Sequence, residues 1–243
     1  MKDKHALITG GGTGIGLAIA KRLTENGAQV TVSGRSEQAL VDSGFNYVIM
    51  DVTDEQSVNR AFAEIAPVDI LVSNAGNAQT APLLKTPLEM WENMLAVNLT
   101  GAFLCAKAGI PAMLEKGWGR FIVIASTSAL KGYAYTGAYS ASKHGALGLV
   151  KTLAIELAKS GVTANAVCPG FTETDLMTRS IETIVKTTDM NAEQARAALL
   201  KDNPMQRAIQ PDEVAAAVEW LASDDAGSSN GQSIVIDGGE LVS

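Results

Sequence analysis

The chain has 243 residues, of which 47% are hydrophobic and 19% charged, and a formal net charge of -7. This apolar content supplies a sizeable core and excludes a disordered chain. The acidic balance, with Lys and Arg scattered along the chain, gives no positive field, so neither nucleic acid nor a membrane surface is expected as a partner.

No targeting or membrane-spanning segment is expected. The first apolar stretch extends only from Ala6 to Ile8, which is too short for a secretory signal. We find no run of about 18 apolar residues that would cross a bilayer. The two cysteines, Cys105 and Cys168, have apolar neighbours, which predicts buried thiols rather than a disulfide and a cytoplasmic location.

In chain order, short β-rich runs alternate with longer stretches of helical periodicity. About seven strands separated by helices predict an α/β fold, a single doubly wound domain over residues 1–243 whose parallel sheet has helices on both faces. The expected strands are 5–9, 28–33, 47–50, 69–73, 120–126, 162–168 and 232–239. The expected helices are 17–27, 57–66, a long segment within 87–115, 138–159 and a helix-rich stretch that ends at 222.

Several local signals refine these boundaries. Gly27 and Gly161 stand where helices need a left-handed residue at their ends, and Thr53 with Gln56 reads as a capping box. The least regular part is 171–210, in which 191–201 has the pattern of an amphipathic helix. An insertion of this length in a compact domain indicates a lid over substrate.

The first strand is followed by TGGGTGIG, residues 9–16, which leads into a helix. Gly10, Gly14 and Gly16 permit a tight turn, close approach of a pyrophosphate and tight packing of helix on strand, while the helix N-terminus stabilises negative charge. A plain turn would not need five glycines in seven residues, which raise the entropy cost of folding. The turn therefore predicts a Rossmann-like dinucleotide site.

The end of the second strand bears on which dinucleotide is bound. An acid at this position would bond the ribose 2′-hydroxyl, whereas an arginine suits a 2′-phosphate. The chain has Gly34 and Arg35 there, which favours NADP(H). NAD(H) stays possible, because Glu37 is close by and Arg35 can also be read as a solvated loop charge.

With this turn, three further motifs resemble the short-chain dehydrogenase/reductase family: SNAG at 73–76, YSASK at 139–143 and CPG at 168–170. Their order and spacing extend the likeness over the whole chain. The resemblance implies a catalytic set of Asn98, Ser126, Tyr139 and Lys143, with Ser128 a weaker alternative to Ser126. It also implies that Asn98 holds a water that links Lys143 to solvent.

The same resemblance implies which residues surround the cofactor. Asp51 would contact adenine, the segment from Asn74 the adenosine ribose, and the loop from Pro169 the nicotinamide. Thr172 stands where the family usually has an aliphatic residue, and the chain between Arg35 and Asp51 is shorter than usual, so a stunted helix is expected there. The full set is Gly10, Thr13, Gly14, Ile15, Gly16, Arg35, Asp51, Val52, Asn74, Ala75, Gly76, Tyr139, Lys143, Pro169, Gly170, Thr172 and Thr174.

The spacing of Tyr139 and Lys143 suggests a proton shuttle. Residues four apart share a helix face, and a neighbouring ammonium favours the phenolate. We therefore expect Lys143, together with an oxidised nicotinamide, to lower the pKa of Tyr139 toward the working range. Ser126 would donate to the developing oxyanion. Taken singly, each residue also has a structural reading: Ser126 as a strand cap and Asn98 as a response to a kink near Gly101.

No metal is predicted, since His5 and His144 lack partners at ligand spacing. An apolar pocket is expected from Leu176, Met177, Leu130, Tyr133 and Tyr135. Among relatives the chain looks most like 3-oxoacyl thioester (CoA or ACP) reductases that interconvert a ketone and a secondary alcohol, and the family resemblance implies a homotetramer. The alternatives are an enzyme of small, alicyclic or aromatic-derived alcohols and ketones, and a non-catalytic NADP(H) sensor.

Overall fold

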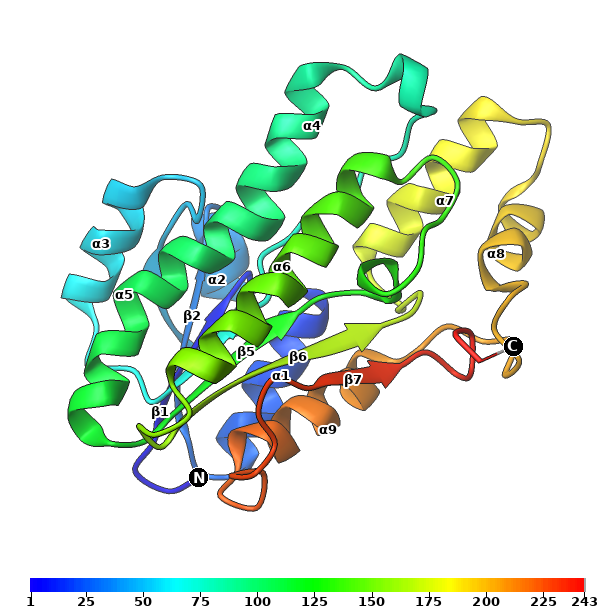
Figure 1. Cartoon of the computed structure of the whole chain (residues 1–243). Coiled ribbons are helices and arrows are strands. Elements are labelled where there is room, and N and C mark those ends of the chain that lie inside the picture. Colours follow the sequence, from blue (N-terminus) through cyan, green and yellow to red (C-terminus); the bar gives the residue numbers. More distant parts are fainter. Residues whose placement is uncertain (243) are drawn as a thin grey trace.

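The computed structural model describes residues 1–242 and has one parallel sheet of seven strands in the order β3-β2-β1-β4-β5-β6-β7 (Figure 1). The order reverses at β1, which pairs with both β2 and β4. This doubly wound arrangement confirms the predicted α/β Rossmann-like fold. The strands are β1 (His5–Thr9), β2 (Gln29–Gly34), β3 (Asn46–Ile49), β4 (Ile70–Ser73), β5 (Gly119–Ile124), β6 (Val162–Pro169) and β7 (Ser233–Ile236).

Helices cover both faces of the sheet. The helices α3, α5 and α6 lie on one face, with α1 and α9 on the other, while α7 and α8 stand beyond the carboxyl ends of the strands (Figure 1). The helices are α1 (Gly14–Glu25), α2 (Glu37–Ser43), α3 (Glu55–Glu64), α4 (Leu88–Leu95), α5 (Gly101–Lys116), α6 (Gly137–Glu156), α7 (Asp175–Thr187), α8 (Ala192–Leu200) and α9 (Pro211–Ala222). Shorter helical turns are η1 (Leu83–Lys85), the π-helical η2 (Ala96–Thr100) and η3 (Thr127–Ala129).

The buried strands divide their side chains between two cores. Leu7 packs with the α3, α5 and α6 side, whereas Ala6 and Ile8 on either side of it pack with the α1 and α9 side. Alternate residues of a strand point to opposite faces, so a strand covered on both faces is apolar throughout. Cys105 and Cys168 are free thiols in the first core, as predicted.

Two local predictions need correction, and a third is confirmed. The N-cap of α3 is Asp54, whose carboxylate accepts from Gln56 N, so the capping box at Thr53 is wrong; Thr53 donates to Asp51 instead. The segment 171–210 is more regular than expected, because most of it forms α7 and α8. The expected stunted helix is confirmed as α2, which has seven residues.

One helical run, Leu88–Lys116, is long and apolar enough to cross a membrane by length and composition, which differs from the sequence expectation. Half of the most apolar 18 residues of this run are buried inside the fold, where α5 packs on β4, β5 and α3. A core helix passes the same test, so the finding is weak evidence for a membrane span.

Candidate active site

The turn between β1 and α1 has the geometry that a phosphate cradle requires. Gly10 and Gly14 have φ values of +64° and +53°, in the left-handed region where a side chain would be strained. A methyl group added at Gly16 would overlap Gly10 O, so only glycine lets the helix approach the turn this closely. Thr13 is the N-cap of α1 but makes no side-chain cap bond, and the first turn has no acidic residue. The N-terminus of α1 is therefore suited to an anion.

Asn74 secures this turn from β4. Its side-chain amide donates to Thr9 O at 2.9 Å and to Gly10 O at 3.1 Å, while Thr9 Oγ1 accepts from the backbone N–H groups of Asn74 and Ala75. The Asn74 side chain thus fixes the turn, which leaves the backbone of Ala75 and Gly76 as the part available to a ribose. Thr9 was not predicted, and its place at the end of the first strand is the only sequence signal for it.

The adenosine end of the site lies beyond β2 and β3. Arg35 is exposed after β2, and its charge acts on Asp51. Burial raises the pKa of Asp51, but hydrogen bonds from Thr53 and the charge of Arg35 outweigh it and leave the pKa lowered. Glu37 accepts a hydrogen bond from Tyr47 at 3.2 Å. Glu37 is therefore hydrogen-bonded to Tyr47, whereas Arg35 is an exposed positive charge directly after this strand.

Val52 belongs to the core rather than to an open surface. It is 8% exposed, and a methyl group added at Gly101 would lie 2.8 Å from its side chain. Ile15, the second residue of α1, packs against the core on the other side of the sheet. Neither side chain offers a polar group, so any cofactor contact would involve backbone or apolar surface.

The loop after β6 meets the glycine-rich turn. A methyl group at Gly14 would lie 3.3 Å from Thr174, the N-cap of α7. Thr172 is buried, donates to Gly170 O at 3.0 Å and pairs with Ile209. This hydrogen bond explains how a polar residue fits at that position: Thr172 donates its hydroxyl proton to Gly170 O within the loop that follows Pro169.

The predicted catalytic residues come together at the carboxyl ends of β4 and β5. Lys143 is 5% exposed and donates from Nζ to Ile124 O at 2.8 Å. A methyl group at Gly76 would lie 3.5 Å from Lys143 Nζ and 3.0 Å from Asn98 Oδ1. Residues from α6, η2 and the loop after β4 are therefore adjacent, and a side chain at position 76 would be crowded between them.

Asn98 lies in the π-helix η2 and is buried. Its side chain accepts from Asn77 N and donates to Asn77 O, each at 2.9 Å, and it also contacts Ser142 Oγ at 3.1 Å. The side-chain amide is thus hydrogen-bonded within the protein, and Asn98 lies at a helix irregularity, as its structural reading predicted. Its catalytic role stays a prediction. Asn77 and Ser142 were not predicted, because these contacts join segments 21 and 44 residues from Asn98.

Ser126 and Tyr139 face each other across this cluster. Ser126 accepts from Ser128 N at 3.1 Å and hydrogen-bonds Tyr139, whereas the Ser128 hydroxyl pairs with Ser140 at 2.7 Å. Ser126 is therefore the better placed of the two serines. It also caps η3, so both of its sequence interpretations apply.

The protein groups by themselves raise the pKa of Tyr139, so the expected effect of Lys143 is wrong for the chain alone. Burial raises this pKa most, the hydrogen bond with Ser126 lowers it in part, and Cys168 raises it. Burial also lowers the pKa of Lys143 to about 8. Its Nζ is 5.8 Å from the centre of the Tyr139 ring and directed to Ile124 O, which explains the weak effect on the phenol.

The structure separates some residues that were expected to line an apolar pocket. Met177 is 3% exposed and packs with Leu200 and Ala208, so it belongs to the interior of the α7–α8 segment. Leu130 and Tyr135 are exposed. Tyr135 has a φ of +68°, an unusual conformation for an aromatic residue, and its carbonyl accepts from Ala81 N.

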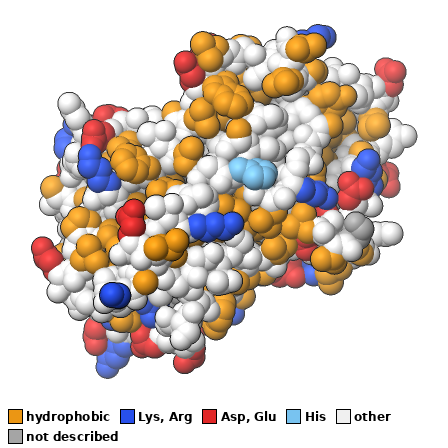
Figure 2. All heavy atoms as spheres, viewed as in Figure 1, with side chains coloured by type: hydrophobic (Ala, Val, Ile, Leu, Met, Phe, Trp, Pro, Cys, Tyr) orange, Lys and Arg blue, Asp and Glu red, His pale blue; other side chains and the backbone are white. Residues whose placement is uncertain are grey.

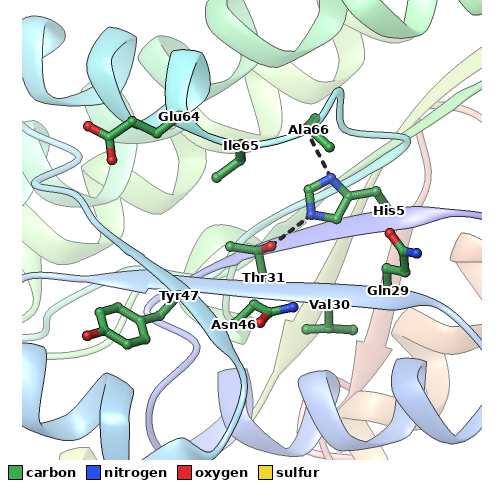
Figure 3. A pocket seen from close by; sticks show the side chains of 9 residues that line it. All are labelled: His5, Gln29, Val30, Thr31, Asn46, Tyr47, Glu64, Ile65 and Ala66. Atoms are coloured by element: carbon green, nitrogen blue, oxygen red, sulfur yellow. Dashed lines mark hydrogen bonds between the residues drawn. The ribbon is translucent and has the colours of Figure 1, made fainter.

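A separate hollow of about 270 Å³ lies at the other end of the sheet (Figure 3). Its residues include His5, Gln29 and Asn46, which begin β1, β2 and β3, whereas the candidate site follows the ends of strands. The His5 ring bonds Thr31 and Ala66, in keeping with a structural role. Within residues 1–242, no group of three or more His, Cys, Asp or Glu side chains is placed to hold a metal.

Comparison with known proteins identifies the family. The model of the family described as enoyl-(acyl carrier protein) reductase matches residues 10–240. The chain is 40% identical to the 3-oxoacyl-[acyl-carrier-protein] reductase MabA of Mycobacterium bovis over 98% of this chain and 92% of that protein. It is 37% identical to a D-beta-hydroxybutyrate dehydrogenase of Rhizobium meliloti over 97% and 98% of the two chains.

A solved structure gives the same result. Actinorhodin polyketide ketoreductase, crystallised as a variant with NADPH, is 35% identical, with a TM-score of 0.93 and coverage of 99% of both chains. The glycine-rich turn, the order of the motifs and the full-length matches agree, and the chain belongs to the short-chain dehydrogenase/reductase family.

Proposed function

We propose that the protein is an NADP(H)-dependent oxidoreductase that reduces a 3-oxoacyl thioester to the 3-hydroxy product. The observation that carries this proposal is the meeting of Ser126, Tyr139 and Lys143 beside the glycine-rich turn. Two hydroxyl groups that face each other suit a substrate oxygen that gains negative charge and then a proton. This chemistry fits a ketone better than a carbon–carbon double bond.

The site fits NADP(H). Gly10, Gly14 and Gly16 leave space for a pyrophosphate at the N-terminus of α1, and Arg35 offers a charge to a 2′-phosphate. Glu37, which would disfavour that phosphate, is held by Tyr47. The solved ketoreductase with NADPH supports this choice. NADPH, when bound, supplies the hydride.

The residues of the chain would then act on the oxygen. Ser126 donates a hydrogen bond that stabilises the developing oxyanion, and Tyr139 delivers the proton. Because burial keeps the pKa of Tyr139 raised, the phenol carries its proton at neutral pH and acts as the acid. Lys143, held by Ile124 O, places positive charge next to this centre, while Asn98 fixes the loop at Asn77.

The substrate class rests on two observations. First, the names of two relatives refer to a 3-oxoacyl or a hydroxybutyrate substrate, and that of the solved structure refers to a polyketide ketoreductase. Second, the exposed apolar residues Leu83, Leu84, Leu130 and Tyr135 lie in the loops before and beside α6 and suit an acyl chain.

The test is to follow NADPH loss with acetoacetyl-CoA, free acetoacetate and a panel of simple ketones, and to repeat it with NADH. We expect the highest kcat/KM with acetoacetyl-CoA and NADPH. Preference for free acetoacetate and NADH would favour a hydroxybutyrate dehydrogenase, and preference for simple ketones the other enzyme alternative. NADPH binding without turnover on the whole panel would support the sensor and overturn the proposal.

We further infer a cytoplasmic homotetramer in which 171–210 acts as the substrate lid of a single domain. The outer faces of α5 and α6 support the assembly, because Phe103, Leu114 and Ile155 are exposed there. On this face of the molecule, hydrophobic side chains are spread among scattered charged ones (Figure 2). Exposed apolar surface of this kind marks contacts between proteins.

A further inference from the structure

The turn after β7 brings a buried carboxylate to the candidate site. Glu240 is 4% exposed although it lies close to the end of the chain. Asp237 fixes this turn, because its carboxylate accepts from the N–H groups of Gly239 and Leu241 at 2.8 Å each. Burying a carboxylate is costly unless it is paired, so the partners of Glu240 indicate what the turn does.

Two of those partners lie in the loop that follows β5. The Tyr133 hydroxyl donates to Glu240 Oε1, and Lys131 Nζ is 3.4 Å from the same oxygen. Lys131 Nζ also lies 4.8 Å from the centre of the Tyr133 ring. A carboxylate, a phenol and an ammonium thus form one compact group.

Tyr133 connects this group to the catalytic segment. Its oxygen is 2.8 Å from Thr127 Oγ1, and Thr127 follows Ser126 directly. Because a phenol has a single proton, Tyr133 donates it to Glu240 and leaves its oxygen to accept from Thr127. Burial, and next the hydrogen bond to Glu240, raise the pKa of Tyr133, so it stays a donor at all physiological pH values.

The other side of the turn touches two more segments of the site. A methyl group at Gly170 would lie 3.2 Å from Glu240 Oε2, so the carboxylate rests on the loop after β6. Methyl groups at Gly238 and Gly239 would meet Asn203 and Pro204 at the end of the lid segment. The turn therefore contacts the β5 loop, the β6 loop and the lid at once.

We propose that Glu240 and Tyr133 are positioning residues for the reduction: they hold Ser126 where it can face the substrate oxygen without touching substrate themselves. The inference rests on the proposed function. Small displacements at a catalytic group have large effects on rate, since its hydrogen bonds act only in the correct geometry.

The chain contains a control carboxylate outside the candidate site. Glu219 on α9 accepts from Arg22 in the last turn of α1, so it also joins two elements of the fold. Comparison of Glu240→Ala with Glu219→Ala therefore separates loss of a carboxylate contact in general from loss of this one.

The experiment measures the melting temperature of Tyr133→Phe, of these variants and of the double variant at positions 133 and 240. It then measures kcat and KM for each at a temperature well below its melting temperature. We expect Tyr133→Phe and Glu240→Ala each to lower kcat about 10-fold with KM for NADPH nearly unchanged, and the double variant to fall no further, because the two residues act as one unit. Glu240→Gln should keep most of kcat, since its amide oxygen still accepts from Tyr133. Glu219→Ala should keep all of it.

Wild-type kcat in Tyr133→Phe and Glu240→Ala, even with lowered melting temperatures, would overturn the inference and leave a structural role. So would fully additive losses. If Glu240→Ala fails to fold, Thr127→Val together with Tyr133→Phe makes the same test from the other end of the chain of contacts. Lack of ketone turnover in the unaltered protein would overturn the proposed function as well, which distinguishes the two failures.

Discussion

Tyr139 and Lys143 show how burial sets the chemistry of single side chains. Both stand on α6, but desolvation acts on them in opposite directions: it favours the neutral phenol and the neutral amine. At neutral pH the phenol is protonated and Lys143, with a pKa of about 8, still mostly carries its positive charge, which suits proton donation in the reduction. The reverse reaction needs added positive charge near the phenol, as the oxidised cofactor provides.

Replacing Tyr139 with Phe removes only the proposed acid. We expect kcat to fall by about 10²–10⁴-fold, the range for loss of a general acid, with NADPH affinity and melting temperature retained. Steady-state rates and NADPH fluorescence titration make the measurement. A kcat close to wild type would exclude Tyr139 as the proton donor.

Lys143 should be held in place at a cost in stability. Its pKa falls from 10.5 to about 8, so the folded chain loses this proton first and the unfolded chain binds more protons between these values. Stability from this group therefore rises with pH across that window, and below pH 8 the full penalty, about 3 kcal/mol, applies.

Lys143→Met removes this penalty and one hydrogen bond to Ile124 O. The free energy of unfolding should rise by about 2 kcal/mol at pH 7, and the gain over wild type should shrink toward pH 10, while turnover is lost. Urea unfolding at both pH values tests this, with Lys151→Met on the same helix as control. A less stable variant at pH 7 would contradict the burial argument.

At the scale of elements, the β1–turn–α1 unit depends on contacts that leave no space for a side chain. A methyl group at Gly16 would overlap Gly10 O and lie 2.6 Å from Asn74 Nδ2, both of which are fixed by hydrogen bonds. Gly16→Ala should therefore lower the melting temperature and abolish NADPH binding.

Gly148→Ala is the matched control for that change. Gly148 also lies in a helix, but nothing is within 4 Å of an added methyl group, and alanine favours a helix by about 1 kcal/mol. Its melting temperature should stay or rise and its NADPH binding should persist. Equal losses in both variants would show that close packing at the turn is not the reason.

The end of β2 carries the prediction on cofactor choice. Arg35→Ser should lower kcat/KM for NADPH about 10- to 100-fold, the loss of one or two charge-assisted bonds, and leave that for NADH nearly unchanged. Arg60→Ser on α3 is the control. A similar fall with both cofactors would mean that Arg35 does not face the 2′-phosphate.

The sequence predicted elements more reliably than contacts. The strand at His5–Thr9 and the helix at Gly137–Glu156 have strong periodicity and were found within a few residues. The N-cap at Asp54 and the π-helix at Ala96–Thr100 were not predicted. The cap rests on a single hydrogen bond from Gln56 N, and Asn98 in the π-helix bonds Asn77, which is 21 residues away in the sequence. Motif spacing located the candidate catalytic residues, but the partners of Asn98 and Tyr133 arise only when distant segments pack.

At the scale of the whole molecule, the outer surface differs from face to face. α5 and α6 carry exposed apolar residues, among them Phe103, Leu114 and Ile155, although only the inner sides of these helices reach the sheet. Exposed apolar surface often marks contacts between proteins. The net charge of -7 opposes nonspecific association, so the proposed assembly would depend on specific contacts through these helices.

Ile155 on α6 is the most direct test of that assembly, because 78% of it is exposed although it is apolar. We expect sedimentation of the unaltered protein to give four chain masses, and Ile155→Glu to give smaller species because a buried unpaired charge opposes association. Val41→Glu on α2, also exposed, is the matched control and should leave the tetramer intact. A tetramer in Ile155→Glu would place the contact elsewhere, and a monomer in the unaltered chain would refute the assembly itself.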